Sequence, residues 1–554
     1  MKLLFLALLT CLFATAAIGD AAPASLIANG NFETVSNGQP EGWGFKTATT
    51  LEVEDGSHFM RLKTVTPGEQ VLVYKRVDLK PGVKAVELKY RVRYDGIQRG
   101  EKQWFDGRIM MNFKDADGSE VKPAPKHPNF AGTSKADPKA KKDAPAAWIE
   151  RTQQFRVPEG AAYLEMLFTL FNAKAGTLDF DDITLTPYPV AEIDKAEQAA
   201  REKEAARIAA LPKPKPKVAV PPADKLPKAL KVEGNRLKDT DGKEVWLQGV
   251  AIPSMEWSAG GENILKSIEV AITGWKANCI RLPIKSNFWN GVGPYQRDGG
   301  MQYRQTVDDA VNLVATHGAY IVIDLHEYRA PTEKHAEFWK AVAAKYANHP
   351  AVLFDLLNEP HDISWDVWQK GGLVTDKPKE GEALNENQQK LKGFPSIGMQ
   401  KLVDTVRGTG AKNIVIAGGL DWAYDLSGII NGHALSDPSG NGVMYSTHVY
   451  PWKSDWKNKF LAVAEKHPIF MGEVGADEQR MEFIPPERHE DPHKWVPDML
   501  GVIQKHKLNW TAWSFHPKAS PRALADWDYT PTSFWGAYVK RALAGELFEV
   551  KKMR

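Results

Sequence analysis

Two stretches of the sequence decide its fold: Tyr320-Ile321-Val322-Ile323-Asp324-Leu325-His326 and Val352-Leu353-Phe354-Asp355-Leu356-Leu357-Asn358-Glu359-Pro360. Each is a short apolar run that ends in polar side chains. Between them, residues 337–346 have the spacing of an amphipathic helix. Short apolar runs that alternate with helices are typical of parallel strands buried on both faces. We therefore expect a strand–helix–strand unit with polar groups at the carboxyl end of each strand.

The same alternation continues over residues 231–554. Helix-like segments such as residues 399–407 separate eight strand-like runs, at residues 244–252, 278–282, 320–325, 352–357, 413–417, 443–448, 469–473 and 510–514. Eight alternations of this kind predict a (β/α)₈ barrel, the TIM-barrel fold, as the larger domain.

Polar residues follow nearly every one of these predicted strands. In a barrel the carboxyl ends of the strands meet at one face, which is where active sites of this fold lie. The candidate site residues are Arg281, His326, Asn358, Glu359, His448, Tyr450, Glu473 and Trp513.

Two of these candidates, Glu359 and Glu473, follow the fourth and seventh strands and should face each other across the barrel mouth. Cleavage of a glycosidic bond needs one carboxyl group to protonate the leaving oxygen and a second to attack or stabilise the anomeric carbon. Neither glutamate has the sequence spacing of a metal ligand, and no cofactor is expected for this chemistry. The one dense histidine cluster, at residues 489–493, lies in a proline-rich loop and is interpreted as surface rather than a metal site.

Residues 26–189 have a different pattern. Strict alternation of apolar and polar residues over 86–94 predicts a half-buried strand, and turn residues separate it from further runs at 70–77, 107–113, 148–157 and 163–171. No helical spacing intervenes, so we expect an antiparallel β-sandwich of jelly-roll type. Trp104 and Trp148 either stack on a glycan or pack in this domain's core.

Residues 190–230 are expected to link the two domains. Their first half is rich in Ala, Glu, Lys and Arg, which favour a solvated helix. Their second half contains Pro212, Pro214 and Pro216, and alternating proline favours an extended, semi-rigid spacer.

The first 21 residues and the overall composition suggest where the protein acts. A short apolar run after Met1-Lys2 ends in small residues, which is typical of a cleaved signal peptide and predicts a secreted or periplasmic protein. A lipoprotein signal would acylate Cys11, but Thr10 before it fits that signal poorly. After cleavage Cys279 would be the single cysteine, so no intramolecular disulfide is expected. With 71 basic and 69 acidic residues, the chain offers no general attraction to nucleic acid, and no later segment is apolar enough to span a membrane.

With these motifs together, residues 231–554 resemble glycoside hydrolase family 5, whose members are retaining, cellulase-type barrels. The resemblance implies that Glu359 is the general acid/base and Glu473 the nucleophile. It further implies that Asn358 binds the sugar 2-hydroxyl and that Arg281 and Tyr450 support the nucleophile. By the same resemblance, His326 and His448 bind substrate or orient the acid/base, and Trp513 is the platform on which a sugar stacks.

The smaller domain resembles the jelly-roll carbohydrate-binding modules of families 4 and 9. The resemblance rests on its opening motif, residues 26–33 with Gly42-Trp43, and on its closing motif, residues 178–185. In such modules, acidic groups near the two ends often hold a structural calcium ion. The candidates here are Glu33, Asp181 and Asp182, and the alternative is that they are solvated side chains at strand ends.

The expected protein is therefore a secreted, monomeric, retaining β-glycanase acting on a polysaccharide. An endo-β-1,4-glucanase is favoured by residues 418–425 and 447–452, which resemble the cellulases of the family more than its mannanases. The alternatives are a β-mannanase, a xyloglucanase or a mixed-linkage β-glucanase. In another class, the alternative is a glycan-binding protein without catalysis, which would be expected to lack one of the two glutamates.

Overall fold

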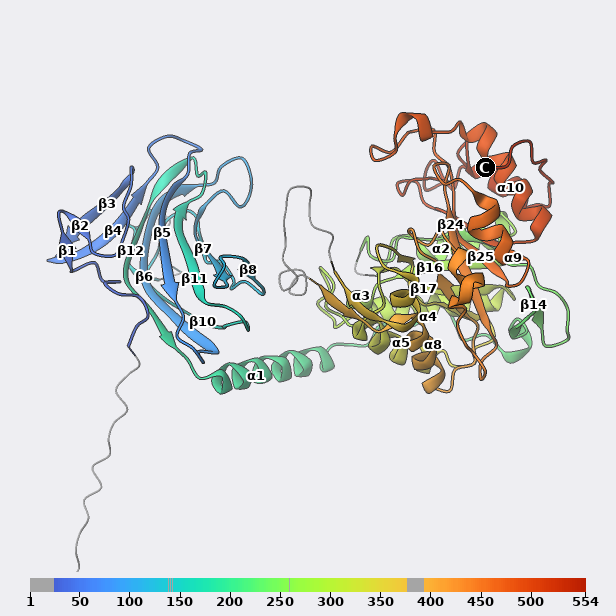
Figure 1. The fold of residues 1–554 in the computed structure, drawn as a ribbon, viewed down its shortest axis with the longest axis horizontal. Coiled ribbons are helices and arrows are strands. Elements are labelled where there is room, and N and C mark those ends of the chain that lie inside the picture. Colours follow the sequence, from blue (N-terminus) through green and yellow to red (C-terminus); the bar gives the residue numbers. More distant parts are fainter. Residues whose placement is uncertain (1–23, 138, 140, 142, 259, 376–392) are drawn as a thin grey trace, which may run out of the picture. The chain divides into compact units, whose positions relative to one another are not determined.

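The computed structural model describes residues 24–375 and 393–554, except residues 138, 140, 142 and 259. The predicted signal peptide and Cys11 lie outside these residues. The chain forms two compact units that meet in sequence between Ala206 and Arg207 (Figure 1). The division falls within the segment that was expected to be a linker.

The first unit contains two five-stranded antiparallel sheets, as predicted for a sandwich. One has the strand order β10-β6-β12-β4-β3 and the other contains β5, β11, β7, β8 and β9. The strands are β1 (Val35–Ser36), β2 (Gln39–Pro40), β3 (Thr49–Glu54), β4 (Ser57–Lys63), β5 (Val71–Asp78), β6 (Ala85–Gln98), β7 (Gly107–Lys114), β8 (Glu120–Val121), β9 (Asn129–Phe130), β10 (Ile149–Arg156), β11 (Tyr163–Leu170) and β12 (Ala175–Pro187).

The alternation in strand β6 explains the core of this unit. Val86, Leu88 and Val92 are fully buried, whereas the polar residues between them face outward. The two tryptophans singled out in the sequence are not in this core: Trp104 is 53% exposed, and the half-buried Trp148 lies below the guanidinium groups of Arg91 and Arg93.

The opening and closing motifs of the first unit lie side by side. The Ile183 amide donates to the carbonyl of Gly30 at 2.9 Å. The turn at Gly30 approaches strand β12 so closely that a Cβ atom on Gly30 would lie 1.8 Å from the Ile183 carbonyl oxygen, which explains the glycine.

The three predicted calcium ligands have protein partners near these motifs. Glu33 accepts from the backbone amide of His58 at 2.8 Å, while Asp181 and Asp182 face Arg91 at 3.4 and 3.5 Å. Burial raises the pKa of Asp181 to about 6. A calcium ion at these residues stays a prediction.

The second unit is a closed barrel of eight parallel strands, which confirms the predicted TIM barrel. In barrel order the strands are β15 (Gln248–Ala251), β16 (Cys279–Ile284), β17 (Tyr320–Leu325), β19 (Val352–Asp355), β23 (Val415–Gly418), β24 (Val443–Val449), β25 (Ile469–Val474) and β26 (Asn509–Ala512). All eight overlap the predicted runs.

Helices and short strands surround the barrel (Figure 1). The helices are α1 (Val190–Ala209), which spans the division between the units, and α2 (Ile264–Glu269), α3 (Ser286–Trp289), α4 (Met301–Thr316), α5 (Glu333–Lys345), α6 (Trp365–Lys370), α8 (Gly398–Gly408), α9 (Ala462–Ala464), α10 (Pro492–His506) and α11 (Gly536–Leu543). Shorter helical turns are η1 (Ala223–Lys225), η2 (Val270–Gly274), η3 (Ile429–His433), η4 (Lys457–Leu461) and η5 (Pro486–Arg488). The remaining strands are β13 (Leu230–Glu233), β14 (Arg236–Asp239), β18 (Tyr328–Arg329), β20 (Glu359–Pro360), β21 (Gly372–Val374) and β22 (Phe394–Ser396).

Apolar and charged side chains alternate along the barrel strands. Cys279, Val322 and Leu353 belong to one buried apolar cluster, which also contains Leu230 and Leu237 from the β13–β14 hairpin. Two residues further along the same three strands stand Arg281, Asp324 and Asp355, all fully buried. Because side chains in a strand point to the same face every second residue, this places a charged group above each apolar one.

The proline-rich segment after α1 lies against the barrel. The amides of Lys217 and Val218 donate to Asp309 on α4 at 3.1 and 3.3 Å, and the Tyr320 hydroxyl donates to the Lys228 carbonyl at 2.9 Å. Ile208 contacts Gly299, where any side chain would collide with it. The sequence suggested a spacer here, and the structure attaches residues 207–228 to the second unit.

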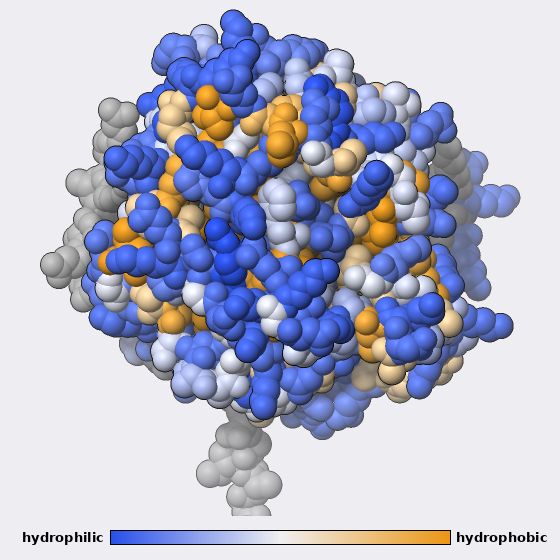
Figure 2. Space-filling model, turned by 90° about the vertical axis from the view of Figure 1, so that its right-hand side faces the viewer, coloured by the Kyte–Doolittle hydropathy of each residue, from blue (hydrophilic) through white to orange (hydrophobic). Residues whose placement is uncertain are grey.

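Hydrophobic residues on the face in Figure 2 lie in small groups among hydrophilic ones. No helix within the described ranges is both long and apolar enough to cross a bilayer.

In the histidine-rich loop, Asp491 caps α10 by accepting from the His493 amide, and Glu490 pairs with Arg554 at 2.7 Å.

Candidate active site

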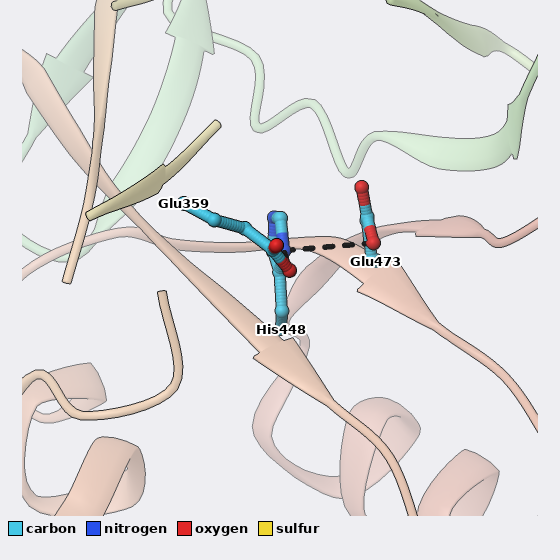
Figure 3. Close-up of side chains that lie close together, drawn as sticks. All are labelled: Glu359, His448 and Glu473. Carbon is cyan, nitrogen blue, oxygen red and sulfur yellow. Dashed lines mark hydrogen bonds and ion pairs between the residues drawn. The ribbon is translucent and has the colours of Figure 1, made fainter. Parts of the chain in front are cut away.

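Glu359 and Glu473 meet at the carboxyl end of the barrel, with His448 between them. His448 on β24 and Glu473 on β25 are paired across the two strands, whereas Glu359 approaches from the short strand β20 (Figure 3). His448 Nδ1 lies 2.9 Å from Glu359 Oε1 and 3.6 Å from Glu473 Oε2. One carboxylate oxygen of each glutamate lies within 4.8 Å of the other.

Glu473 is held by two strong donors. Arg281 Nη1 donates to its Oε1 at 3.0 Å, and the Tyr450 hydroxyl donates to its Oε2 at 2.6 Å. Both donors are buried. Hydrogen bonds from a cation and a hydroxyl favour the ionised carboxylate, so this glutamate is prepared to carry a negative charge.

Glu359 has a different environment. Burial raises its pKa above the ordinary glutamate value, although the positive charges of Arg281 and Lys453 oppose this effect. Burial also lowers the pKa of the neighbouring His448 to about 3, so this histidine is neutral near pH 7. The surroundings of Glu359 therefore favour a protonated carboxyl group, whereas those of Glu473 favour an ionised one. An acid and a nucleophile require this difference.

Gly472 makes this arrangement possible. A Cβ atom at this position would lie 2.7 Å from Ser446 Oγ, 3.0 Å from His448 Nε2 and 3.4 Å from Arg281 Nε. A larger residue would therefore push apart the side chains that surround both glutamates.

His326 and Trp513 form one wall of the site. Their rings are parallel within 3°, with centroids 5.5 Å apart. His326 Nδ1 lies 2.8 Å from Asp324 Oδ2, which fixes the orientation of the imidazole. Burial lowers the pKa of His326 to about 4, so it too is neutral near pH 7.

A cavity of about 680 Å³ opens over the two glutamates. Six of the eight predicted residues line it, while Arg281 and His448 contact the glutamates from within the protein. Six of the lining residues are Phe, Tyr or Trp: Tyr328, Trp422, Tyr450, Trp452, Phe483 and Trp513. Flat rings around a pair of carboxyl groups suit a ligand with both apolar faces and hydroxyl edges.

Trp422 stands on an unusual turn at the rim of this cavity. Asp421, Trp422 and Ala423 all have left-handed backbone conformations, with φ of 56°, 62° and 58°. Such residues are strained and persist only where their surroundings fix them. Here the Trp422 amide donates to the Pro360 carbonyl at 3.1 Å, and the His361 ring stacks on the indole at 3.6 Å. Trp422 is 45% exposed and lines the cavity, and these two contacts hold its ring in place.

Comparison with known proteins identifies the second unit. The family model described as Cellulase (glycosyl hydrolase family 5) matches residues 238–519, about half of the chain. The chain belongs to glycoside hydrolase family 5. It is a cellulase-like glycoside hydrolase, and the matched residues contain both glutamates.

Curated relatives of this family 5 enzyme are distant. Cellulase CelDZ1 from Thermoanaerobacterium sp is 24% identical over 353 residues, which cover 57% of this chain and 81% of the relative. Endoglucanase A from Butyrivibrio fibrisolvens is 26% identical over 261 residues, covering 44% of this chain. This chain spans only about half of that second relative, 52% of its length.

Among solved structures, a β-glucanase from Saccharophagus degradans is 24% identical, with a TM-score of 0.46, and the match covers 60% of this chain and 98% of that one. Another structure of the same β-glucanase is a complex with cellotetraose. The matches identify no family for the sandwich unit.

All eight residues that the strand-end pattern singled out come together at one end of the barrel. The pattern missed Tyr328 on the short strand β18 and Lys453 in the loop after β24, which both line the cavity. It also missed Asp324 and Asp355, although both stand in strands just before predicted site residues. Their charge within otherwise apolar runs was the available signal.

Of the tryptophans in predicted loops, Trp422 and Trp452 line the cavity. Trp289 is buried, Trp365 packs on Trp368, and two contact the ring of His516: Trp257 and Trp527.

Among the described residues, one group of three metal-ligating side chains is close enough to bind an ion: Glu359, His448 and Glu473. An ion there would occupy both carboxyl groups.

Proposed function

We propose that this family 5 enzyme is a retaining endo-β-1,4-glucanase with Glu359 as acid/base and Glu473 as nucleophile. The observation that carries the proposal is the approach of the two carboxyl groups to within 4.8 Å. Retaining glycosidases have carboxyl groups about 5–5.5 Å apart, whereas inverting enzymes need about 6.5–9.5 Å to admit a water molecule.

The surroundings of each glutamate support its role. In the first step a Glu473 oxygen attacks the anomeric carbon, the bond to the glycosidic oxygen breaks, and Glu359 gives that oxygen a proton. In the second step Glu359 removes a proton from water, which attacks the same carbon and releases Glu473. The two donors on Glu473 suit the nucleophile, and the raised pKa of Glu359 suits the acid.

A β-1,4-glucan is the proposed substrate for two reasons. The cavity is lined by aromatic rings, among them Trp422 and Trp513, which can stack on the flat faces of β-linked glucose. The relatives that match are named as cellulases, endoglucanases and a β-glucanase. A mannanase, a xyloglucanase and a mixed-linkage glucanase remain as alternatives. We further propose that the protein is secreted and that its sandwich unit binds glycan.

The substrate is tested by reducing-sugar release from a panel of carboxymethylcellulose, barley β-glucan, glucomannan, galactomannan, xyloglucan and xylan. We expect carboxymethylcellulose and barley β-glucan to be cleaved faster than galactomannan. Glu473→Gln is the matched control for contaminating activity. A preference for galactomannan or xyloglucan would contradict the glucanase assignment, and no release from any polysaccharide would favour a binding protein.

The roles of the two glutamates are tested with an activated aryl cellobioside and azide. Glu359→Ala should form the glycosyl-enzyme readily, because an activated phenol leaves without a proton, and should then react slowly with water. Azide should restore its turnover and give the β-glycosyl azide. Glu473→Ala should lose activity, and any azide rescue should give the α-product. Products of exchanged configuration would reverse the two roles.

A further inference from the structure

Below the catalytic pair, one arginine contacts three carboxyl groups. Arg281 donates to Glu473 Oε1 and also contacts Asp324 Oδ1 at 3.1 Å and Asp355 Oδ2 at 3.0 Å. Its Nε donates to the same Asp355 oxygen at 3.1 Å. Arg281, Asp324 and Asp355 are fully buried. Neither aspartate has a part in the proposed reaction steps.

The charges of this cluster do not balance if every carboxyl group is ionised. Three negative charges would surround one guanidinium, directly above the apolar residues Cys279, Val322 and Leu353. A buried charge without compensation is so costly that the group usually changes its protonation state instead.

The other titratable groups around the cluster supply only part of the missing positive charge. His326 after β17 and His448 on β24 are neutral near pH 7, since burial lowers their pKa values. Lys285 after β16 is a cation whose charge acts on Asp324, so three carboxylates would face two positive charges. Glu359 on β20 and Tyr450 after β24 can only add negative charge. A proton on one of the three carboxyl groups leaves two negative charges facing the two positive ones.

The contacts of the individual oxygens indicate which carboxyl group carries this proton. Glu473 has a donor on each oxygen. Among the described residues, Oδ1 of both aspartates lacks a hydrogen-bond partner. Asp324 Oδ1 nevertheless lies 3.1 Å from Arg281 Nη2, and its Oδ2 lies 2.8 Å from His326 Nδ1. Asp355 receives both Arg281 hydrogen bonds on Oδ2, so its Oδ1 is the oxygen that is free to carry the proton.

We propose that Asp355 is a positioning residue that is held as the neutral acid in the resting enzyme, where its Oδ2 fixes the plane of the Arg281 guanidinium. The guanidinium charge is then shared mainly between Asp324 and the nucleophile Glu473. Arg281 Nη2 also donates to Asn358 Oδ1 at 2.7 Å, so the same plane orients the residue expected to bind the 2-hydroxyl. Burial raises the pKa of Asp355 well above its ordinary value, which agrees with the geometry. The inference rests on the proposed function for the role of Glu473.

Infrared spectroscopy tests the proton directly. In the full chain labelled with ¹³C at the aspartate side-chain carboxyl, we expect a protonated-acid carbonyl band at pH 7. Asp355→Asn should remove it, whereas Asp309→Asn, at a buried aspartate outside the cluster, should keep it. A band that titrates away below pH 7, or identical spectra for wild type and Asp355→Asn, would overturn the proposal.

Kinetics on carboxymethylcellulose test the positioning. Asp355→Ala removes the acceptor for Arg281 and should lower kcat about 100-fold, as expected when catalytic groups lose their alignment. Asp355→Asn keeps a neutral acceptor oxygen and should recover most of this loss, with the acidic limb of its pH profile where the wild type has it. An acidic limb that moves in Asp355→Asn would contradict a neutral Asp355.

The infrared measurement needs no substrate, so the two proposals can fail separately. A protein that keeps the aspartic-acid band but hydrolyses no polysaccharide would contradict the proposed function and leave the proton on Asp355 in place. A protein that is active but lacks the band would contradict the proton on Asp355 and leave the proposed function in place.

Discussion

At the scale of the residue, Lys453 is the cation at the cavity rim whose effect on catalysis is simplest to isolate. Its ammonium group donates to the carbonyl and the carboxylate of Asp421, at 3.0 and 2.8 Å. Burial raises the pKa of Glu359, and the positive charge of Lys453 is one of those that lower it. Removing this charge should therefore raise the pKa of Glu359 further.

Lys453→Met is expected to move the alkaline limb of kcat/KM to higher pH by a few tenths of a unit, because the acid stays protonated longer. The pH profile on an unactivated cello-oligosaccharide measures this shift. Lys459→Met is the matched control, since Lys459 pairs with Asp425 at 2.6 Å and does not line the cavity. An alkaline limb that moves to lower pH would show that Glu359 is not the acid.

The site residues that the sequence could predict are those at strand ends, because parallel strands of a barrel finish at one face whatever their loops do. Asp324 and Asp355 were not predicted because their inward direction depends on the stagger of the closed barrel. Tyr328 on the short strand β18 and Lys453 after β24 depend on how the chain folds beyond the barrel strands, and the three left-handed residues around Trp422 have no glycine to mark them. Sequence spacing carries none of this information.

At the scale of the element, the segment between the units shows where local sequence is insufficient. Its alternating prolines correctly indicate an extended chain, but they do not reveal that Asp309 accepts two of its backbone amides. Asp309 is almost fully buried, and it stands on the helix α4, far away in the sequence. The segment is attached through tertiary contacts, and its composition does not reveal them.

We therefore expect a barrel fragment that begins at Arg207 to be more stable than one that begins at Lys231. The shorter fragment loses the acceptor contacts to Asp309 and the Lys228 contact to Tyr320, each worth about 0.5–1.5 kcal/mol. Thermal unfolding should show a Tm lower by several degrees. Asp309→Ala in the longer fragment should reproduce part of the loss. Equal Tm values would mean that the contacts add nothing to stability.

At the scale of the whole molecule, the chain has one unit with a family 5 site and another whose ligand is unidentified. The sequence predicted both fold classes, because alternation with period two and strand–helix alternation are long-range patterns that many residues share. It did not predict β3, β4 and β12 as separate strands, since these are short or interrupted by a bulge in their pairing.

If the sandwich unit binds glycan, it should act by raising the local concentration of substrate and not by changing the chemistry. A fragment of residues 207–554 should then keep its kcat/KM on soluble cello-oligosaccharides within about twofold, while its rate on insoluble cellulose should fall several-fold at low enzyme concentration. Trp104→Ala in the full chain removes an exposed ring of the sandwich and tests whether that face takes part. Binding of the isolated sandwich to insoluble cellulose, measured by depletion, should account for the difference. If the fragment and the full chain hydrolyse insoluble cellulose at the same rate, the first unit has no part in capturing that substrate.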